Sequence, residues 1–155
     1  MSRVVLDCSI ALAWCFEDET SPETDKLFDH VRDHGALVPT LWHLEIANVL
    51  VLAERRGRIK VGESEARLEV VAGWPIETDT ETTRRAWRET LALARAERLT
   101  TYEAAYLELA LRAGLPLLTR DEDRAAAARR RGVTVLPEPP SKPRARRGGG
   151  PAPRR

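Results

Sequence analysis

The sequence predicts an α/β fold, a three-layer α/β/α sandwich around a short and mostly parallel sheet. Short apolar segments alternate with longer helical segments along the chain, and this alternation is typical of parallel strands joined by helices. The length of 155 residues also suits one domain that buries a sizeable core.

The first strand and the two helices after it have clear residue patterns. Val4-Val5-Leu6 are apolar and two of them are β-branched, which favours a short buried strand. A helix is expected at residues 9–16. The next helix begins with Ser21 as N-cap and Pro22 at its first position, and it ends at Gly35.

The most apolar helix of the chain is expected at residues 41–56, after a short strand at residues 36–38. A helix that is apolar nearly all round is buried on most sides, either in the core or in a subunit interface. Glu45 and Asn48 are the polar exceptions within it, and their spacing of three residues places them on one face.

The second half of the chain continues the alternation. In its longest helix, Trp87, Leu91 and Ala94 share one face, and this face is expected to pack in the core or in an interface. The expected helices are residues 63–72, 80–98, 100–114 and 121–131, and the expected strands are residues 74–77, 115–119 and 133–136.

The composition changes near residue 137. Residues 1–136 are expected to form the domain, and residues 137–155 a disordered basic tail rich in Pro, Gly and Arg. Six of the 25 Lys and Arg residues lie after residue 139, where there is no acid. The preceding part holds 19 basic against 24 acidic residues, so it needs cations to approach the phosphates of a nucleic acid.

The sequence favours a cytoplasmic protein. No apolar run is long enough to span a bilayer, and no signal peptide precedes Asp7. Cys8 and Cys15 would lie about 10 Å apart on one helix, which is too far for a disulfide. They are expected to be reduced core residues.

Four carboxylates are candidates for a site at the carboxyl edge of the sheet, where ligands bind in α/β folds. Asp7 and Asp121 each follow a short apolar strand and precede a helix, so both are expected at the carboxyl edge of the sheet. Glu103 opens a helix just before the second of these strands, and Glu45 lies inside the apolar helix. Carboxylates gathered at one edge repel each other unless a cation joins them. Oxygen ligands without His or Cys suit Mg²⁺ or Mn²⁺, which can activate water for phosphodiester cleavage.

Each of these acids also has a structural interpretation. Asp7 and Asp121 are favoured N-cap residues for the helices that follow them. Thr100-x-x-Glu103 is a capping box, in which Glu103 bonds back to the start of its helix. Asp123 would replace Asp121 if the register differed.

Four segments resemble the successive motifs of the PIN-domain ribonucleases, and they are most similar to the VapC toxins of bacterial toxin–antitoxin pairs. The segments are residues 4–14, 45–48, 99–110 and 118–121. Each motif is weak alone, but four in the expected order are more specific. The similarity covers roughly residues 3–136.

The resemblance implies a PIN-like fold and metal-dependent endonucleolytic cleavage of RNA, commonly tRNA or ribosomal RNA, with Mg²⁺ or Mn²⁺. Carried over by position, the metal-binding and catalytic acids are Asp7, Glu45, Glu103 and Asp121. The residues that would orient these acids or touch the substrate are Ser9, Asn48 and Thr119.

One residue departs from the family pattern, because the family usually has Asp where this chain has Glu103. The extra methylene moves the carboxylate by about a bond length, and Mg²⁺ demands near-ideal octahedral geometry. This departure puts full activity or the usual metal preference in doubt.

The resulting hypothesis is a hydrolase, the toxin of a type II toxin–antitoxin pair. Its partners would be the RNA substrate, a second copy in a homodimer, and a cognate antitoxin; no membrane is involved. The antitoxin would place a basic side chain at the acids and an apolar segment on the helices. One alternative is a catalytically silent PIN-like module that binds RNA or antitoxin. A phosphatase or phospho-receiver is disfavoured because its expected partner residues are missing.

Overall fold

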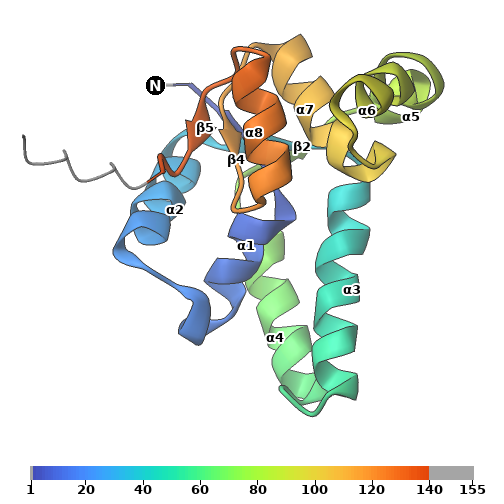
Figure 1. Cartoon of the computed structure of the whole chain (residues 1–155). Coiled ribbons are helices and arrows are strands. Elements are labelled where there is room, and N and C mark those ends of the chain that lie inside the picture. The colour runs from blue at the N-terminus through green and yellow to red at the C-terminus, as the bar shows by residue number, and fades with distance from the viewer. Residues whose placement is uncertain (1, 140–155) are drawn as a thin grey trace, which may run out of the picture.

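The computed structural model describes residues 2–139 and has the predicted α/β architecture (Figure 1). A sheet of five strands, ordered β3-β2-β1-β4-β5 and parallel throughout, is flanked by helices. The strands are β1 (Val4–Leu6), β2 (Ala36–Val38), β3 (Ile76–Thr78), β4 (Leu117–Leu118) and β5 (Val135–Leu136). The helices are α1 (Cys8–Cys15), α2 (Pro22–His34), α3 (Leu41–Arg55), α4 (Val61–Ala72), α5 (Thr82–Arg85), α6 (Leu91–Glu97), α7 (Thr101–Ala113) and α8 (Glu122–Arg130).

Strand β1 is the centre of the sheet. Val4 pairs with Ala36 of β2 on one side, and Val5 pairs with Leu117 of β4 on the other. The three residues of β1 are buried, as are those of β2 and β4. Because all strands run the same way, their carboxyl ends meet at one edge, where ligands bind in open α/β sheets.

Two helix starts follow the local signals of the sequence. Ser21 and Thr24 form a reciprocal cap on α2, with Pro22 in its first turn. Thr100 and Glu103 form the capping box of α7, and Gly114 ends α7 in the left-handed conformation. Side chains that accept from the orphaned amides of a first turn stabilise the helix end.

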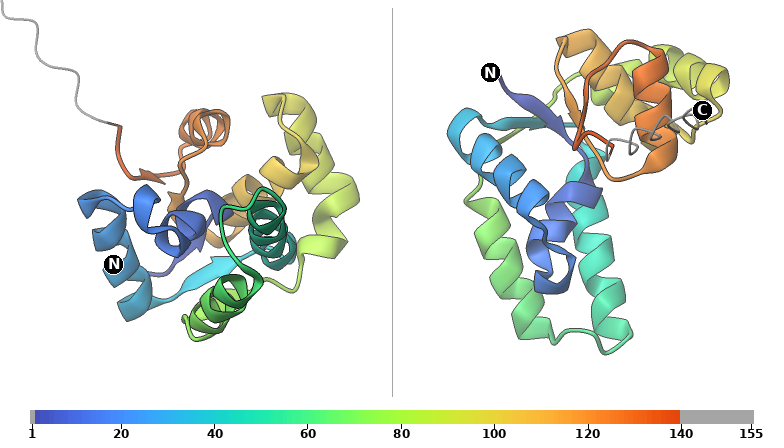
Figure 2. Two further views of the ribbon diagram at one scale, coloured as in Figure 1. Left: turned by 90° about the horizontal axis from the view of Figure 1, so that it is seen from below. Right: turned by 60° about the vertical axis from the view of Figure 1, so that its left-hand side comes forward.

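Helix α3 is buried along one stripe only and leaves apolar surface exposed on the single chain, so its expected burial in a subunit interface stays a prediction. Its core stripe is Trp42, Ile46, Leu50 and Ala53, while Leu44 is 75% exposed. Figures 1 and 2 show α3 and α4 as a helical hairpin that extends away from the sheet beside α1. The hairpin offers fewer neighbours than a central core position, which explains the exposure of one face of α3.

The long helix predicted at residues 80–98 is helical from Thr82 to Glu97, but it is not α-helical throughout. The segment consists of α5, a π-helical turn at Ala86–Thr90, and α6. A π-turn holds an extra residue, so it shifts the phase of the helix face across it. As a result Trp87 is 90% exposed, whereas Leu93 and Ala94 are buried. Trp87 therefore does not pack in the core, and its expected place in an interface stays a prediction.

The structure also bears on the expected cysteines, membrane-spanning helices and basic tail. Cys8 and Cys15 are free thiols, and α1 holds both. Within residues 2–139, no helix is long and apolar enough to cross a membrane. The expected basic tail lies outside the described residues from residue 140 on.

Candidate active site at the carboxyl edge of the sheet

Asp7 is the most deeply buried charged residue at the carboxyl edge. Its side chain is 0% exposed, directly after β1. Its backbone amide donates to the carbonyl of Leu118 at 2.9 Å, which ties it to the end of β4. Asp7 occupies the N-cap position of α1, yet its side chain makes no capping hydrogen bond. The capping interpretation of this carboxylate is therefore not supported, and the side chain is directed to other partners.

Two hydroxyls and one guanidinium surround the Asp7 carboxylate. Ser9 Oγ donates to Asp7 Oδ2 at 2.9 Å, and Thr119 Oγ1 donates to the same oxygen at 2.5 Å. Arg124 donates to Oδ1. These contacts offset the desolvation of a buried carboxylate. Ser9 and Thr119 thus both contact Asp7, and their role as residues that orient the acids or touch the substrate stays a prediction.

Asp121 is joined to Asp7 through Thr119. The Asp121 amide donates to Thr119 Oγ1 at 3.0 Å, on the same hydroxyl that donates to Asp7. Asp121 Oδ1 accepts from the Arg124 amide at 2.8 Å, so its side chain caps α8. The structural interpretation of Asp121 as an N-cap is thus realised, at a position adjoining the buried acid.

Glu45 enters the site from α3. Tyr106 Oη donates to Glu45 Oε1 at 2.6 Å, and Cys8 Sγ donates to Oε2 at 3.4 Å. Burial, followed by the nearby acids, raises the pKa of the Tyr106 hydroxyl and of the Cys8 thiol far above their ordinary values. Both groups therefore stay protonated and act as donors that hold Glu45 in place.

Glu103 and Asn48 form no side-chain hydrogen bond with Asp7, Glu45 or Asp121 in the described part of the chain. Glu103 Oε2 accepts from the Thr100 amide at 2.8 Å, so the capping-box interpretation of Glu103 is realised. Glu103 also lies one turn before Tyr106 on α7, on the same face. Asn48 is exposed, and its side chain forms no hydrogen bond with the described part of the chain.

A family model for the PIN domain matches residues 4–130. The chain belongs to the PIN-domain family. The PIN domain is a family of nucleases that are typically metal-dependent. A search of curated proteins found no match. Among solved structures, the chain is similar to PAE2754 from Pyrobaculum aerophilum at 24% identity. The match covers 87% of this chain and 84% of that chain with a TM-score of 0.65, which shows the fold.

The oxygen donors of this PIN domain fit a hard divalent cation in their chemical type. Arg124 is the positive partner of the buried Asp7 carboxylate in this structure, and the neighbouring acids Glu45 and Asp121 supply further oxygens of the kind Mg²⁺ and Mn²⁺ prefer. As arranged here, no three His, Cys, Asp or Glu side chains within residues 2–139 group closely enough to hold one ion. The four-carboxylate site Asp7, Glu45, Glu103 and Asp121 stays a prediction.

Arg124 is the site residue that sequence reasoning missed. It is 6% exposed, and its guanidinium lies 4.7 Å from the centre of the Tyr106 ring. Burial lowers its pKa, but Asp7, Tyr106 and Asp121 outweigh burial and raise the pKa above the ordinary value. A signal was present: Arg124 shares a helical stripe with Ala125, Ala127 and Ala128, all buried.

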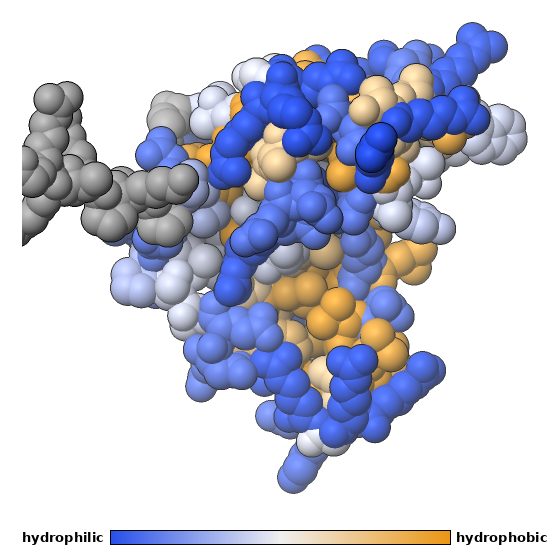
Figure 3. Space-filling view, viewed as in Figure 1, coloured by the Kyte–Doolittle hydropathy of each residue, from blue (hydrophilic) through white to orange (hydrophobic). Residues whose placement is uncertain are grey.

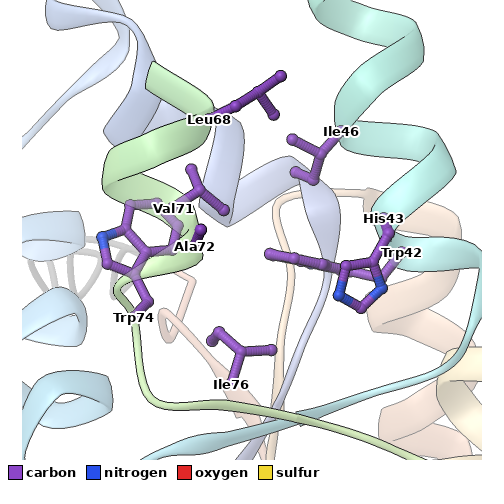
Figure 4. A pocket seen from close by; sticks show the side chains of 8 residues that line it. All are labelled: Trp42, His43, Ile46, Leu68, Val71, Ala72, Trp74 and Ile76. Atoms are coloured by element: carbon purple, nitrogen blue, oxygen red, sulfur yellow. The ribbon is translucent and has the colours of Figure 1, made fainter. Parts of the chain in front are cut away.

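An apolar surface lies beside this edge, on the α3–α4 hairpin. Figure 3 shows apolar side chains gathered over α3 and α4, below a largely hydrophilic upper half. A cavity of about 260 Å³ opens between the two helices. Trp42 and Ile46 of α3 face Leu68 and Val71 of α4 across it (Figure 4). Apolar surface of this kind, rimmed by polar residues, is typical of a protein interaction site.

Proposed function

We propose that this PIN domain is a Mg²⁺- or Mn²⁺-dependent endoribonuclease. One observation carries the proposal: the carboxylate of Asp7 is fully buried at the carboxyl edge of a parallel sheet and is not used as a helix cap. Arg124, Ser9 and Thr119 offset the burial of this charge in the structure, and its place at the ligand-binding edge of the sheet supports a role in holding a ligand. Family membership in a group of nucleases gives the reaction class.

The residues have distinct tasks in this proposal. Asp7, Asp121 and Glu103 would hold the divalent ion, and Glu45 would complete the set or orient the attacking water. When bound, the ion supplies an activated water and neutralises charge on the phosphate. Ser9 and Thr119 fix the rotamer of Asp7 through their hydroxyls.

The experiment is RNA cleavage by the purified chain with Mg²⁺, with Mn²⁺ and with EDTA. Total tRNA and ribosomal RNA serve as substrates, because the resemblance to PIN-domain ribonucleases implies these targets. We expect cleavage with either ion and none with EDTA. Equal cleavage in EDTA would point to a contaminating metal-independent ribonuclease, and no cleavage with any RNA or ion would contradict the proposal.

A Glu103→Gln variant separates the two tasks assigned to Glu103. Glutamine also completes a capping box, so the free energy of unfolding should change by less than about 0.5 kcal/mol. Losing the carboxylate should lower metal-dependent cleavage about tenfold or more, because a hard ion prefers a charged oxygen. Urea denaturation and cleavage rates measure the two effects. Unchanged cleavage would restrict Glu103 to capping.

A second candidate function is a catalytically silent module that binds RNA or antitoxin. The engagement of Glu103 with the Thr100 amide favours it, because this carboxylate is already used in the fold. The two candidates differ in the cleavage experiment. Cleavage that appears only in a Glu103→Asp variant would establish a silenced enzyme.

We further propose that the chain is the toxin of a type II toxin–antitoxin pair. The partner proposal is supported by the exposed apolar surface of the α3–α4 hairpin, which includes Leu44 and Leu68. An apolar antitoxin segment would pack there while a basic side chain reaches the acids. The same helices could join two copies of the chain, so sedimentation of the purified protein tests the homodimer. Growth arrest on induced expression, absent for an Asp7→Asn variant, tests the toxin role.

A further inference from the structure

Arg124 and Asp7 form a buried ion pair at the centre of the candidate site. Arg124 lies in the first turn of α8 and Asp7 directly after β1, and the guanidinium donates to Asp7 Oδ1. Exposure is 6% for Arg124 and 0% for Asp7. The chain therefore places its own cation on the acid that the proposed reaction needs.

Arg112, which is half-buried, shows how a structural ion pair looks in the same fold. Arg112 uses Nε, Nη1 and Nη2 to bond two carboxylates, Asp79 and Glu108. Arg124 makes one side-chain hydrogen bond, to Asp7, and its buried Nε has no partner within residues 2–139. A guanidinium offers five donors in a fixed fork. Arg124 thus makes fewer side-chain hydrogen bonds than Arg112, and its Nε is costly to leave unpaired.

Both carboxylate oxygens of Asp7 already accept hydrogen bonds from side chains. Oδ2 accepts from both Ser9 and Thr119, which uses its two lone pairs. Oδ1 is the oxygen that remains for a cation, and Arg124 contacts it. A divalent ion bound at Oδ1 would lie next to a buried guanidinium, where positive charges repel strongly because little water screens them.

We propose that Arg124 is a built-in counter-ion of Asp7 that competes with the divalent ion for this carboxylate. The inference rests on the proposed metal-dependent function. In the metal-free protein, Arg124 neutralises Asp7 and keeps the edge of the sheet folded. The ion binds as the guanidinium leaves Oδ1, so the chain holds metal more weakly than its acids alone would.

The test is Mn²⁺ binding to the full chain, measured by titration calorimetry without RNA. Arg124→Leu removes the competing charge and keeps an apolar side chain against Tyr106. We expect its Kd for Mn²⁺ to fall about tenfold or more relative to the wild type. Arg129→Leu is the matched control: it removes one positive charge from an exposed position of the same helix. Its Kd should stay within about twofold.

The leucine variant leaves Asp7 buried without its cation, so it needs a companion. Arg124→Gln keeps a hydrogen bond to Asp7 without the charge and should also bind Mn²⁺ more tightly. If the leucine variant is unfolded without metal, the glutamine variant decides. An equal or weaker affinity in the folded Arg124 variants would overturn the proposal, as would the same gain in Arg129→Leu.

The outcome also separates this proposal from the nuclease proposal. Suppose that the Arg124 variants bind Mn²⁺ more tightly but neither they nor the wild type cleave RNA: this result would support the competition proposal and contradict the nuclease proposal. Metal-dependent cleavage with unchanged Mn²⁺ affinity would support the nuclease proposal and contradict the competition proposal. A Mn²⁺ site that persists in Asp7→Asn/Arg124→Leu lies elsewhere, and this result would overturn the competition.

Discussion

An Asp7→Asn variant should lose RNA cleavage and stability together. Cleavage should fall at least about 100-fold, because the amide cannot replace the charged oxygen facing the ion. The free energy of unfolding should fall by about 3 kcal/mol or more, because Arg124 is left buried without its counter-ion. Cleavage rates with Mn²⁺ and urea denaturation measure the two losses.

The double variant Asp7→Asn/Arg124→Leu distinguishes these effects. It removes both charges of the pair, so most of the lost stability should return. Cleavage should stay absent because the carboxylate is still missing. A double variant that regains cleavage would remove Asp7 from the reaction, and a single variant as stable as the wild type would show that Arg124 is not stabilised by Asp7.

Replacing Arg112 by methionine should be strongly destabilising although it lies outside the site. Arg112 joins Asp79, which follows β3, to Glu108 of α7, and both carboxylates are 7% exposed. Removing the shared guanidinium leaves Asp79 with the Thr82 hydroxyl and Glu108 with Arg85 as their remaining side-chain partners. The free energy of unfolding should fall by about 2–3 kcal/mol. Arg32→Met is the control: its ion pairs with Asp29 and Asp33 are exposed, so it should cost less than about 1 kcal/mol.

The Arg112 effect should depend on pH with a definite sign. Burial raises the pKa of Asp79, but hydrogen bonds from Arg112 and Thr82 outweigh burial and hold the pKa below its ordinary value. A carboxyl with a lowered folded-state pKa contributes stability above its unfolded pKa of about 3.9, and loses it as pH falls through the folded value. The difference between wild type and Arg112→Met should therefore be full at pH 7 and smaller near pH 3. A difference that grows toward low pH would contradict this account.

The sheet and the position of Asp7 could be predicted because they depend on local patterns. Short β-branched runs mark strands, and a parallel sheet brings the residues after those strands to one edge. The caps at Ser21 and Thr100 depend on residues three apart, so the sequence displays them directly. The position of Trp87 outside the core could not be predicted in this way, because no local sequence pattern indicates the π-turn before it.

The contacts inside the site could not be predicted, because they join distant parts of the chain. Glu45 meets Tyr106 from 61 residues away, and Arg124 meets Asp7 from 117 residues away. The sequence pattern shows which face of a helix or strand a side chain occupies. It does not show which residue of another element will contact that side chain. Arg124 shows this limit: a charged residue in a helix is usually solvated, and here the tertiary structure buries it.

The central position of β1 in the sheet also has a consequence for assembly during synthesis. Asp7 is made 112 residues before its partner Thr119 and 117 residues before its partner Arg124. Strand β1 gains its neighbour β4 only after residues 117–118 have left the ribosome. A chain that stops before this point lacks the partners of Asp7 that β4 and α8 bring to the carboxyl edge. The contacts that hold the Asp7 carboxylate are therefore complete only after residue 124 has been made.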